Sequence, residues 1–155
     1  MPLTLIPLPP EKFSSWLGRS ISEYITDLIA TGIPGEQAKD NAQSTMTRSF
    51  PEGQATLTNA VFTLADEVLG DVGYLWVGQD TSGDPTSWWV WDIVVEAEHR
   101  GHGFGRQAMI LAEDYARSQG GETIGLNVFG FNKAARGLYE SLGYETTSVK
   151  MRKTL

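Results

Sequence analysis

The chain has 155 residues, of which 41% are hydrophobic and 20% are charged, and its formal net charge is −7. The apolar fraction and five tryptophans indicate a packed globular core rather than a disordered chain, and the acidity argues against nonspecific nucleic-acid binding. The chain contains no cysteine, which excludes disulfides, thiolate metal sites and a cysteine nucleophile, and its two histidines are too few for a histidine-rich metal site.

The sequence also lacks targeting and membrane signals. No apolar run reaches the roughly 18 residues of a membrane span. The first ten residues contain four prolines and no basic side chain, unlike a secretory signal peptide. We therefore expect a cytoplasmic protein with no membrane partner. At this length we expect a single domain over residues 1–155.

The first 50 residues predict a short strand and two helices. Leu3–Leu8 is an apolar segment suited to a sheet edge, since Pro7 cannot donate a ladder hydrogen bond. Apolar residues then recur at steps of three and four, which predicts a helix over Glu11–Ala30. Glycine and proline follow, and a second helix is predicted over Glu36–Arg48, with a weaker apolar face.

The middle of the chain predicts three strands. Val61–Ala65 and Val72–Gln79 have strand composition and are separated by turn residues. Asp80–Pro85 is a second cluster of turn residues. The strand predicted over Ser87–Val95 is almost entirely apolar, so we expect it to be central and covered on both faces.

The last third alternates helices with strands. A helix is predicted over Gln107–Gln119, a strand over Thr123–Val128, a helix after the N-cap Asn132, and a last strand over Tyr144–Arg152. Antiparallel strands early and helix-separated strands late predict an α/β fold with one mixed sheet.

The segment Arg100–Arg106 joins the apolar strand to the next helix and contains three alternating glycines. Glycines let backbone N–H groups approach a ligand, and a helix N-terminus offers free donors and partial positive charge to phosphate oxygens. A Walker A loop would need Lys-Ser/Thr after Gly105, and a dinucleotide loop would need Gly-x-Gly-x-x-Gly. A pyrophosphate-binding loop of another kind is therefore predicted. The residues themselves leave open a plain glycine-rich turn and a nucleotide-binding module.

This loop resembles the acyl-CoA loop of the GNAT superfamily of N-acetyltransferases, Gln/Arg-x-x-Gly-x-Gly/Ala, through Arg100, Gly103 and Gly105. The segment that follows the next strand resembles the family's downstream motif, Asn-x-x-Ala-x-x-x-Tyr-x-x-x-Gly-Phe/Tyr. The matching residues are Asn132, Ala135, Tyr139, Gly143 and Tyr144. The two motifs occur in the family's order, and the resemblance covers roughly residue 57 to the end.

The resemblance implies a fold and a cosubstrate. The fold is a mixed, mostly antiparallel sheet of about six to seven strands flanked by about four helices. The cosubstrate is acetyl-CoA, with no metal. The pyrophosphate would bind the loop, and the pantetheine arm would pair with the backbone of the preceding strand. Residues implied in binding are Ile93, Val94, Val95, Arg100, Gly101, His102, Gly103, Phe104, Gly105, Arg106, Asn132, Ala135 and Tyr139.

The resemblance also implies direct attack of an amine on the thioester in a ternary complex. Tyr139 is the candidate general acid, since a phenol is protonated at neutral pH and Tyr139 lies two helical turns from Asn132 on one face. Some relatives place a glutamate base where Asn127 stands. Asp92, a carboxylate inside an apolar strand, is the remaining candidate base and would need a partner or a raised pKa. A purely structural Asp92 and a water-mediated base stay open.

The expected acceptor is a primary amine of a small molecule, a protein N-terminus or a lysine. We expect it between the first two helices and the turn near residues 80–88, with Trp76, Trp88, Trp89 and Trp91 available as an aromatic wall. No nucleic-acid partner is expected, and a homodimer is left open. The alternative function is a non-catalytic acyl-CoA-binding protein on the same fold.

Overall fold

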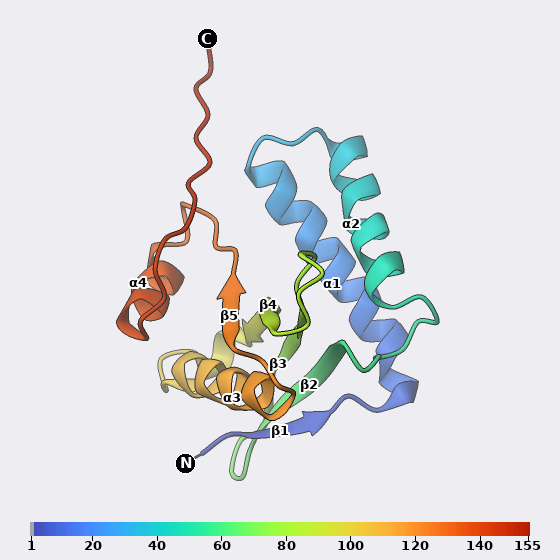
Figure 1. The fold of residues 1–155 in the computed structure, drawn as a ribbon, viewed down its shortest axis with the longest axis vertical. Helices are drawn as coiled ribbons and strands as arrows, with labels where there is room; N and C mark the ends of the chain where they lie inside the picture. The colour runs from blue at the N-terminus through green and yellow to red at the C-terminus, as the bar shows by residue number, and fades with distance from the viewer. Residues whose placement is uncertain (1) are drawn as a thin grey trace.

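The computed structural model describes residues 2–155 (Figure 1). None of the helices within these residues is long and apolar enough to cross a membrane. The elements, in chain order, are β1 (Thr4–Pro7), α1 (Pro10–Ala30), α2 (Gly35–Ser49), β2 (Asn59–Asp66), β3 (Gly70–Gln79), β4 (Ser87–Val95), the 3₁₀ turn η1 (Ala97–His99), α3 (Phe104–Ser118), β5 (Thr123–Leu126) and α4 (Lys133–Ser141).

The strands form one sheet in the order β1-β2-β3-β4-β5. The first three pairings are antiparallel, and β4 pairs with β5 in parallel. The predicted mixed, mostly antiparallel sheet and the four flanking helices are therefore confirmed. The helix that follows the glycine loop begins at Phe104, three residues before the predicted start.

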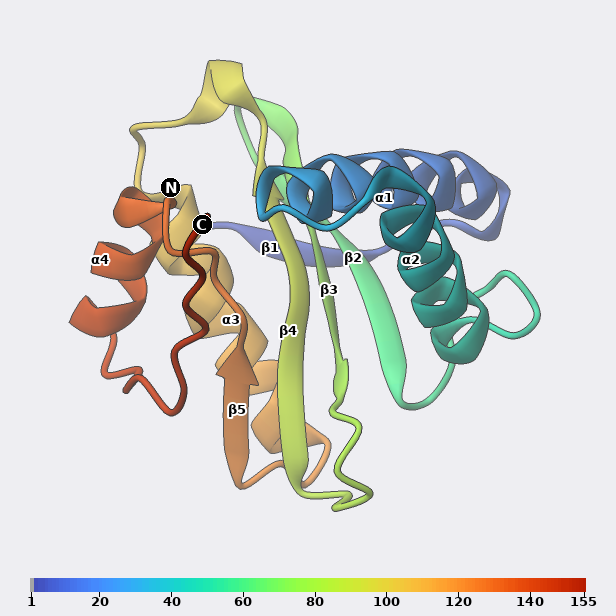
Figure 2. The same ribbon diagram turned by 90° about the horizontal axis from the view of Figure 1, so that it is seen from above.

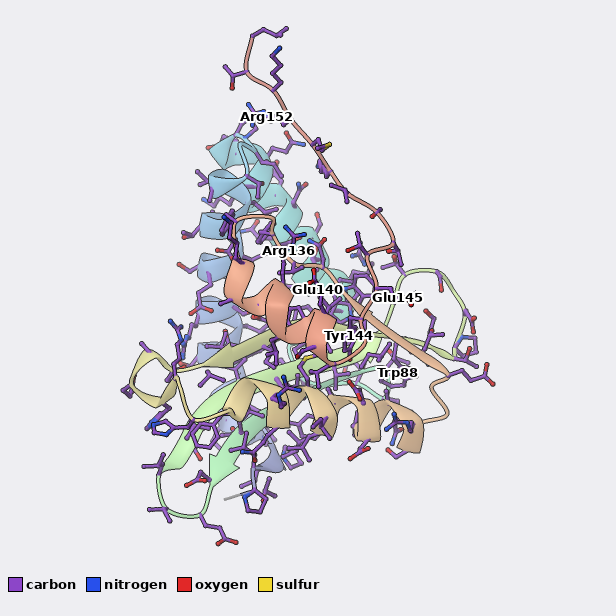
Figure 3. All side chains as sticks on the ribbon, turned by 90° about the vertical axis from the view of Figure 1, so that its left-hand side faces the viewer. Trp88, Arg136, Glu140, Tyr144, Glu145 and Arg152 are labelled. Atoms are coloured by element: carbon purple, nitrogen blue, oxygen red, sulfur yellow. The ribbon has the colours of Figure 1, made fainter. Side chains whose placement is uncertain are left out.

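The prediction of a last strand over Tyr144–Arg152 is wrong, so the sheet of residues 2–155 has five strands rather than six or seven. The segment after α4 instead runs past β5 toward the end of α1 (Figures 1 and 3), where the Arg152 guanidinium donates to the carbonyl of Thr31 at 3.3 Å. A strand needs an apolar face to bury. This segment offers mainly Val149 and Met151, which stay 70% and 89% exposed.

Helices α1 and α2 cover one face of the sheet, and α3 covers the other (Figure 2). On the first face, aromatic rings of α1 meet those of β3 edge-to-face. Trp16 lies 5.9 Å from Tyr74 and 5.8 Å from Trp76 between ring centroids. We call this cluster the α1-side core; its buried members are Phe13, Trp16, Met46, Phe50, Val61, Tyr74 and Trp76.

The opposite face, which we call the α3-side core, joins small residues of α3 to the aliphatic side chains of the strands. Ala108, Met109 and Ala112 are fully buried there, which lets the α3 backbone approach the sheet closely. Trp88 and Val90 of β4 belong to this cluster, while Trp91 and Val94 pack against the α1-side core. The expectation that this strand is central and covered on both faces is confirmed.

Candidate active site

A cavity of about 620 Å³ opens where β4 and β5 part. The two strands pair only from Ser87↔Thr123 to Val90↔Leu126, so β4 continues through Val95 with no β5 partner on that edge. The cavity is walled by α1, the second half of β4, residues 126–129, and the side chains of Asn132 and Tyr139. Unpaired strand backbone at the wall of a cavity can hydrogen-bond an extended ligand.

A β-bulge in β4 turns a carboxylate into this cavity. The register steps from Val77↔Val90 to Trp76↔Asp92, so Trp91 is an extra residue in β4. Without it, strand alternation would point Asp92 toward α3, like Trp88 and Val90. With it, Asp92 turns toward α1. Bulges often redirect side chains beside active sites, and this one moves a carboxylate from an apolar core to a polar network.

The Asp92 carboxylate accepts hydrogen bonds from two elements. Its Oδ2 lies 3.2 Å from the Ser20 hydroxyl of α1 and 3.3 Å from the Tyr74 hydroxyl of β3. The Tyr74 hydroxyl also lies 2.7 Å from Glu23 Oε2, so the phenol stands between two carboxylates. Burial, and then the charge of Glu23, raise the pKa of Asp92 to about 6, against the lowering effect of the hydrogen bonds. Asp92 thus has both the partner and the raised pKa that a buried carboxylate at this position needs.

Tyr139 of α4 lines the same cavity. Its side chain is half-buried, and burial, followed by the charge of Asp92, raises its pKa. Asn132, seven residues earlier, lines the cavity as well and accepts from the Ala135 amide at 3.3 Å as the N-cap of α4. The predicted common face of Asn132 and Tyr139 and the predicted cap are both confirmed.

The glycine loop follows β4 and η1 and leads into α3. Gly101 and Gly103 have φ angles of +85° and +77°, a backbone conformation that residues other than glycine rarely adopt. Gly103 is the N-cap of α3. Within residues 2–155, no acceptor is hydrogen-bonded to the six consecutive backbone N–H groups of residues 101–106. Such a run of free donors at the start of a 15-residue helix suits phosphate oxygens.

The structure brings together some of the remaining predicted residues but not others. Ile93, Val94 and Arg100 line the cavity, while Val95, Ala135 and the loop residues 101–106 do not. The Arg100 Nε donates to the Val95 carbonyl at 3.0 Å, which ties the loop to the end of β4. His102 is exposed and Phe104 is buried in the α3-side core, so the loop offers phosphate the backbone of these two residues rather than their side chains.

Arg106 and Asn127 are the two other positions that the sequence comparison singled out. Arg106, one of the residues implied in cofactor binding, is exposed, and its Nη2 donates to the Ser141 hydroxyl of α4 at 2.6 Å. Asn127 follows β5, is exposed, and lines the cavity without a carboxylate.

The cavity does not coincide with the expected position of the acceptor. The turn of residues 80–88 lies at the start of β4, whereas the cavity lies at its far end, and none of these residues lines it. Trp88 is buried in the α3-side core and cannot form the aromatic wall, but Trp76, Trp89 and Trp91 do line the cavity.

Sequence reasoning missed the α1 side of the cavity. Arg19, Ser20 and Glu23 line it together with Asp92. Ser20 and Asp92 are 72 positions apart, and no motif connects them. The only available signal was polar residues at helical spacing on α1, which equally fits a solvated face.

Comparison with known proteins agrees with this geometry. The model of the acetyltransferase (GNAT) family matches residues 34–144. The chain is 29% identical to the uncharacterized N-acetyltransferase YycN of Bacillus subtilis, with all of both chains covered. The crystal structure of YycN has a TM-score of 0.87, covering 99% of this chain and 98% of that one. A probable N-acetyltransferase family 8 member of Mus musculus is 26% identical over 95% of this chain and 65% of its own length.

The chain therefore belongs to the acetyltransferase (GNAT) family. By this membership and its relatives, it is an N-acetyltransferase. Enzymes of the family act on amine acceptors with acetyl-CoA. A Trypanosoma brucei acetyltransferase, at 22% identity and a TM-score of 0.58, shares the fold over 99% of both chains.

Proposed function

We propose that the protein transfers the acetyl group of acetyl-CoA to a primary amine by direct attack, with Asp92 as general base and Tyr139 as general acid. One observation carries the proposal. A carboxylate with a pKa of about 6 and a phenol whose pKa is raised both line one cavity, at the point where β4 loses its β5 partner.

The residues present fit acetyl-CoA. The free N–H groups of residues 101–106 would hold the pyrophosphate, where a positive φ and the lack of side chains at Gly101 and Gly103 leave the backbone accessible. A Cβ built on either glycine meets no atom within 4 Å, so the space above the loop is open. The pantetheine arm would lie along the unpaired edge of β4 at Ile93 and Val94.

The proton balance uses both side chains. An amine arrives mostly protonated and must lose a proton before it attacks. Asp92, directly or through one water, takes that proton. The C–N bond then forms, the C–S bond breaks, and the acylated nitrogen releases its second proton to solvent, while Tyr139 gives its proton to the leaving thiolate. The products are an amide and CoA, and the proton on Asp92 replenishes Tyr139 through solvent. A base with a pKa near 6 is ionised at neutral pH, and proton transfer of this kind contributes about 10²–10⁴-fold in rate.

The test measures thiol release from acetyl-CoA with a panel of primary amines, and acetyl-CoA binding by calorimetry. We expect turnover in the wild type, and in Asp92→Asn a loss of about 10²-fold or more in kcat with acetyl-CoA affinity retained. Asp40→Asn on α2 removes the same charge from an exposed position outside the cavity and serves as control. Binding without turnover of any amine would instead favour the non-catalytic acyl-CoA-binding protein, and competition by ATP would favour a nucleotide-binding module.

A further inference from the structure

The cavity has an acceptor side, formed by α1 and the bulge of β4, that is rich in carboxylates. Five carboxylates line the whole cavity against two guanidiniums. Both guanidiniums are engaged: Arg100 with the Val95 carbonyl, and Arg19 with Glu23 at 2.8 Å and Glu96 at 2.7 Å. Arg19 also lies over the Tyr74 ring, with 5.2 Å from guanidinium carbon to ring centroid. The cavity thus keeps a net negative charge that its own cations do not neutralise.

Polar side chains on α1 form a line away from the reacting centre. Ser20, Glu23 and Asp27 are spaced by three and four residues, so they share one helix face, and all three line the cavity. Ser20 bonds Asp92. Asp27 lies seven residues further, which is about 10 Å along the axis at 1.5 Å per residue. Within residues 2–155, no hydrogen bond or ion pair involves the Asp27 carboxylate, and desolvation and then the charge of Glu23 raise its pKa.

An aromatic surface accompanies these carboxylates. Trp91, the extra residue of the bulge, stacks on Trp76 with ring centroids 5.5 Å apart and planes at 21°. Its indole N–H donates to the Gln79 carbonyl at 3.3 Å, which holds the ring at the cavity wall. An indole face attracts ammonium groups and packs against methylene chains. The aromatic surface is independent of the carboxylates, and both suit the same kind of ligand.

We propose that the acceptor is an aliphatic diamine or polyamine, whose reacting amine lies at Asp92 while a second ammonium, about 10 Å away, binds Asp27. The methylene chain between them packs along Trp91. The inference rests on the proposed function and specifies its substrate class. The second ammonium keeps its proton throughout, since Asp27 and Glu23 favour the charged form, and only the amine at Asp92 is deprotonated and acetylated.

The experiment compares ligands that differ by one charge. Hexylamine and 1,6-diaminohexane, and octylamine and 1,8-diaminooctane, are assayed for kcat/KM with wild type, Asp27→Asn and the matched control Asp40→Asn. Neither substitution touches a group with an assigned role in proton transfer. Calorimetric titration of the same amines into the complex of the protein with CoA measures their binding without turnover.

We expect the wild type to prefer each diamine over its monoamine by about fivefold, from the ion pair that the second ammonium makes with Asp27. Asp27→Asn should remove most of this preference, while Asp40→Asn should keep it. The preference should also weaken in 0.5 M salt. Equal kcat/KM for diamine and monoamine, an Asp27→Asn variant that keeps the preference, or faster acetylation of a lysine peptide than of any free diamine would each overturn the inference.

Failure of the proposed function has a different signature. If no amine is acetylated while diamines still bind the CoA complex more tightly than monoamines, the ligand class stands and the transfer reaction fails. If monoamines are acetylated as fast as diamines, the reaction stands and the substrate class fails. If neither turnover nor selective binding appears, both fail.

Discussion

Replacement of Asp92 by asparagine should make the protein more stable at pH 8 while it loses activity. The side-chain amide keeps an oxygen acceptor for Ser20 and Tyr74 but removes a charge that burial and Glu23 disfavour. A rise in pKa from 3.8 to about 6 corresponds to about 3 kcal/mol between the two protonation states. Because the side chain is partly solvated, we expect about 1–3 kcal/mol, or about 3–10 °C in a domain of this size.

The size of this stability difference depends on pH. The folded-state pKa of Asp92 is raised above its unfolded value, so the folded state is favoured by proton binding below pH 3.8, and this advantage is lost as the pH rises through about 6. The stability of the wild type should therefore decrease relative to that of Asp92→Asn between pH 4 and pH 7. Above that the difference should stay constant, and near pH 4 it should be small.

The assay is a set of thermal melts of both proteins from pH 4.5 to pH 8, with Asp40→Asn as the control for removal of one negative charge at an exposed position. A gain in Tm for Asp92→Asn that grows with pH supports the reasoning. A variant that is less stable than wild type at pH 8 would refute it, because the ionised carboxylate would then be worth more to the fold than its burial costs. The kcat of the same samples shows whether the buried carboxylate is also the one that catalysis requires.

Three further outcomes are expected. Gly103→Val should weaken acetyl-CoA binding at least tenfold by calorimetry, since φ is +77° at the α3 N-cap. Gly53→Val, at a residue with a φ of +70° outside the loop, controls for backbone strain. Equal acetyl-CoA affinities of Gly103→Val and wild type would remove the loop from the binding site. Tyr139→Phe should lower kcat about 10²-fold at nearly constant acetyl-CoA affinity, and full activity would exclude the acid role. Glu23→Gln removes a charge that raises the pKa of Asp92, so the acid limb of kcat/KM should move to lower pH, and an unmoved limb would contradict the coupling.

The parts of the site that sequence predicted are local ones. Gly101, Gly103 and the start of α3 are fixed by backbone conformations that only neighbouring residues determine. Asn132 caps α4 through an amide three residues away, and the common face of Asn132 and Tyr139 follows from helical spacing alone. These features need no knowledge of the rest of the fold, and they are the ones that the two motifs contain.

The parts that sequence missed depend on contacts between distant segments. The sequence of residues 87–95 does not indicate that Trp91 is an extra residue, because the bulge is defined only by the pairing of β4 with β3. Without the bulge, strand alternation sends Asp92 toward α3 and away from Ser20, so its partners could not be predicted. The prediction of a last strand over Tyr144–Arg152 was wrong for a related reason. Alternation over Tyr144–Arg152 is compatible with pairing, but Val149 and Met151 have no apolar surface to cover in this fold.

In the proposed mechanism, the charge of Asp92 would help one small cavity hold both a base and an acid, because it is one of the causes that raise the pKa of Tyr139. Burial alone would raise the pKa of Asp92 and of Tyr139. When Asp92 is ionised and ready to accept a proton, its negative charge disfavours a phenolate nearby, so Tyr139 keeps the proton that the leaving thiolate needs. When Asp92 has taken the proton of the amine, that charge is gone, and loss of the Tyr139 proton becomes easier at the step that requires it. For the proposed mechanism, this charge effect favours proton uptake by Asp92 before proton loss from Tyr139.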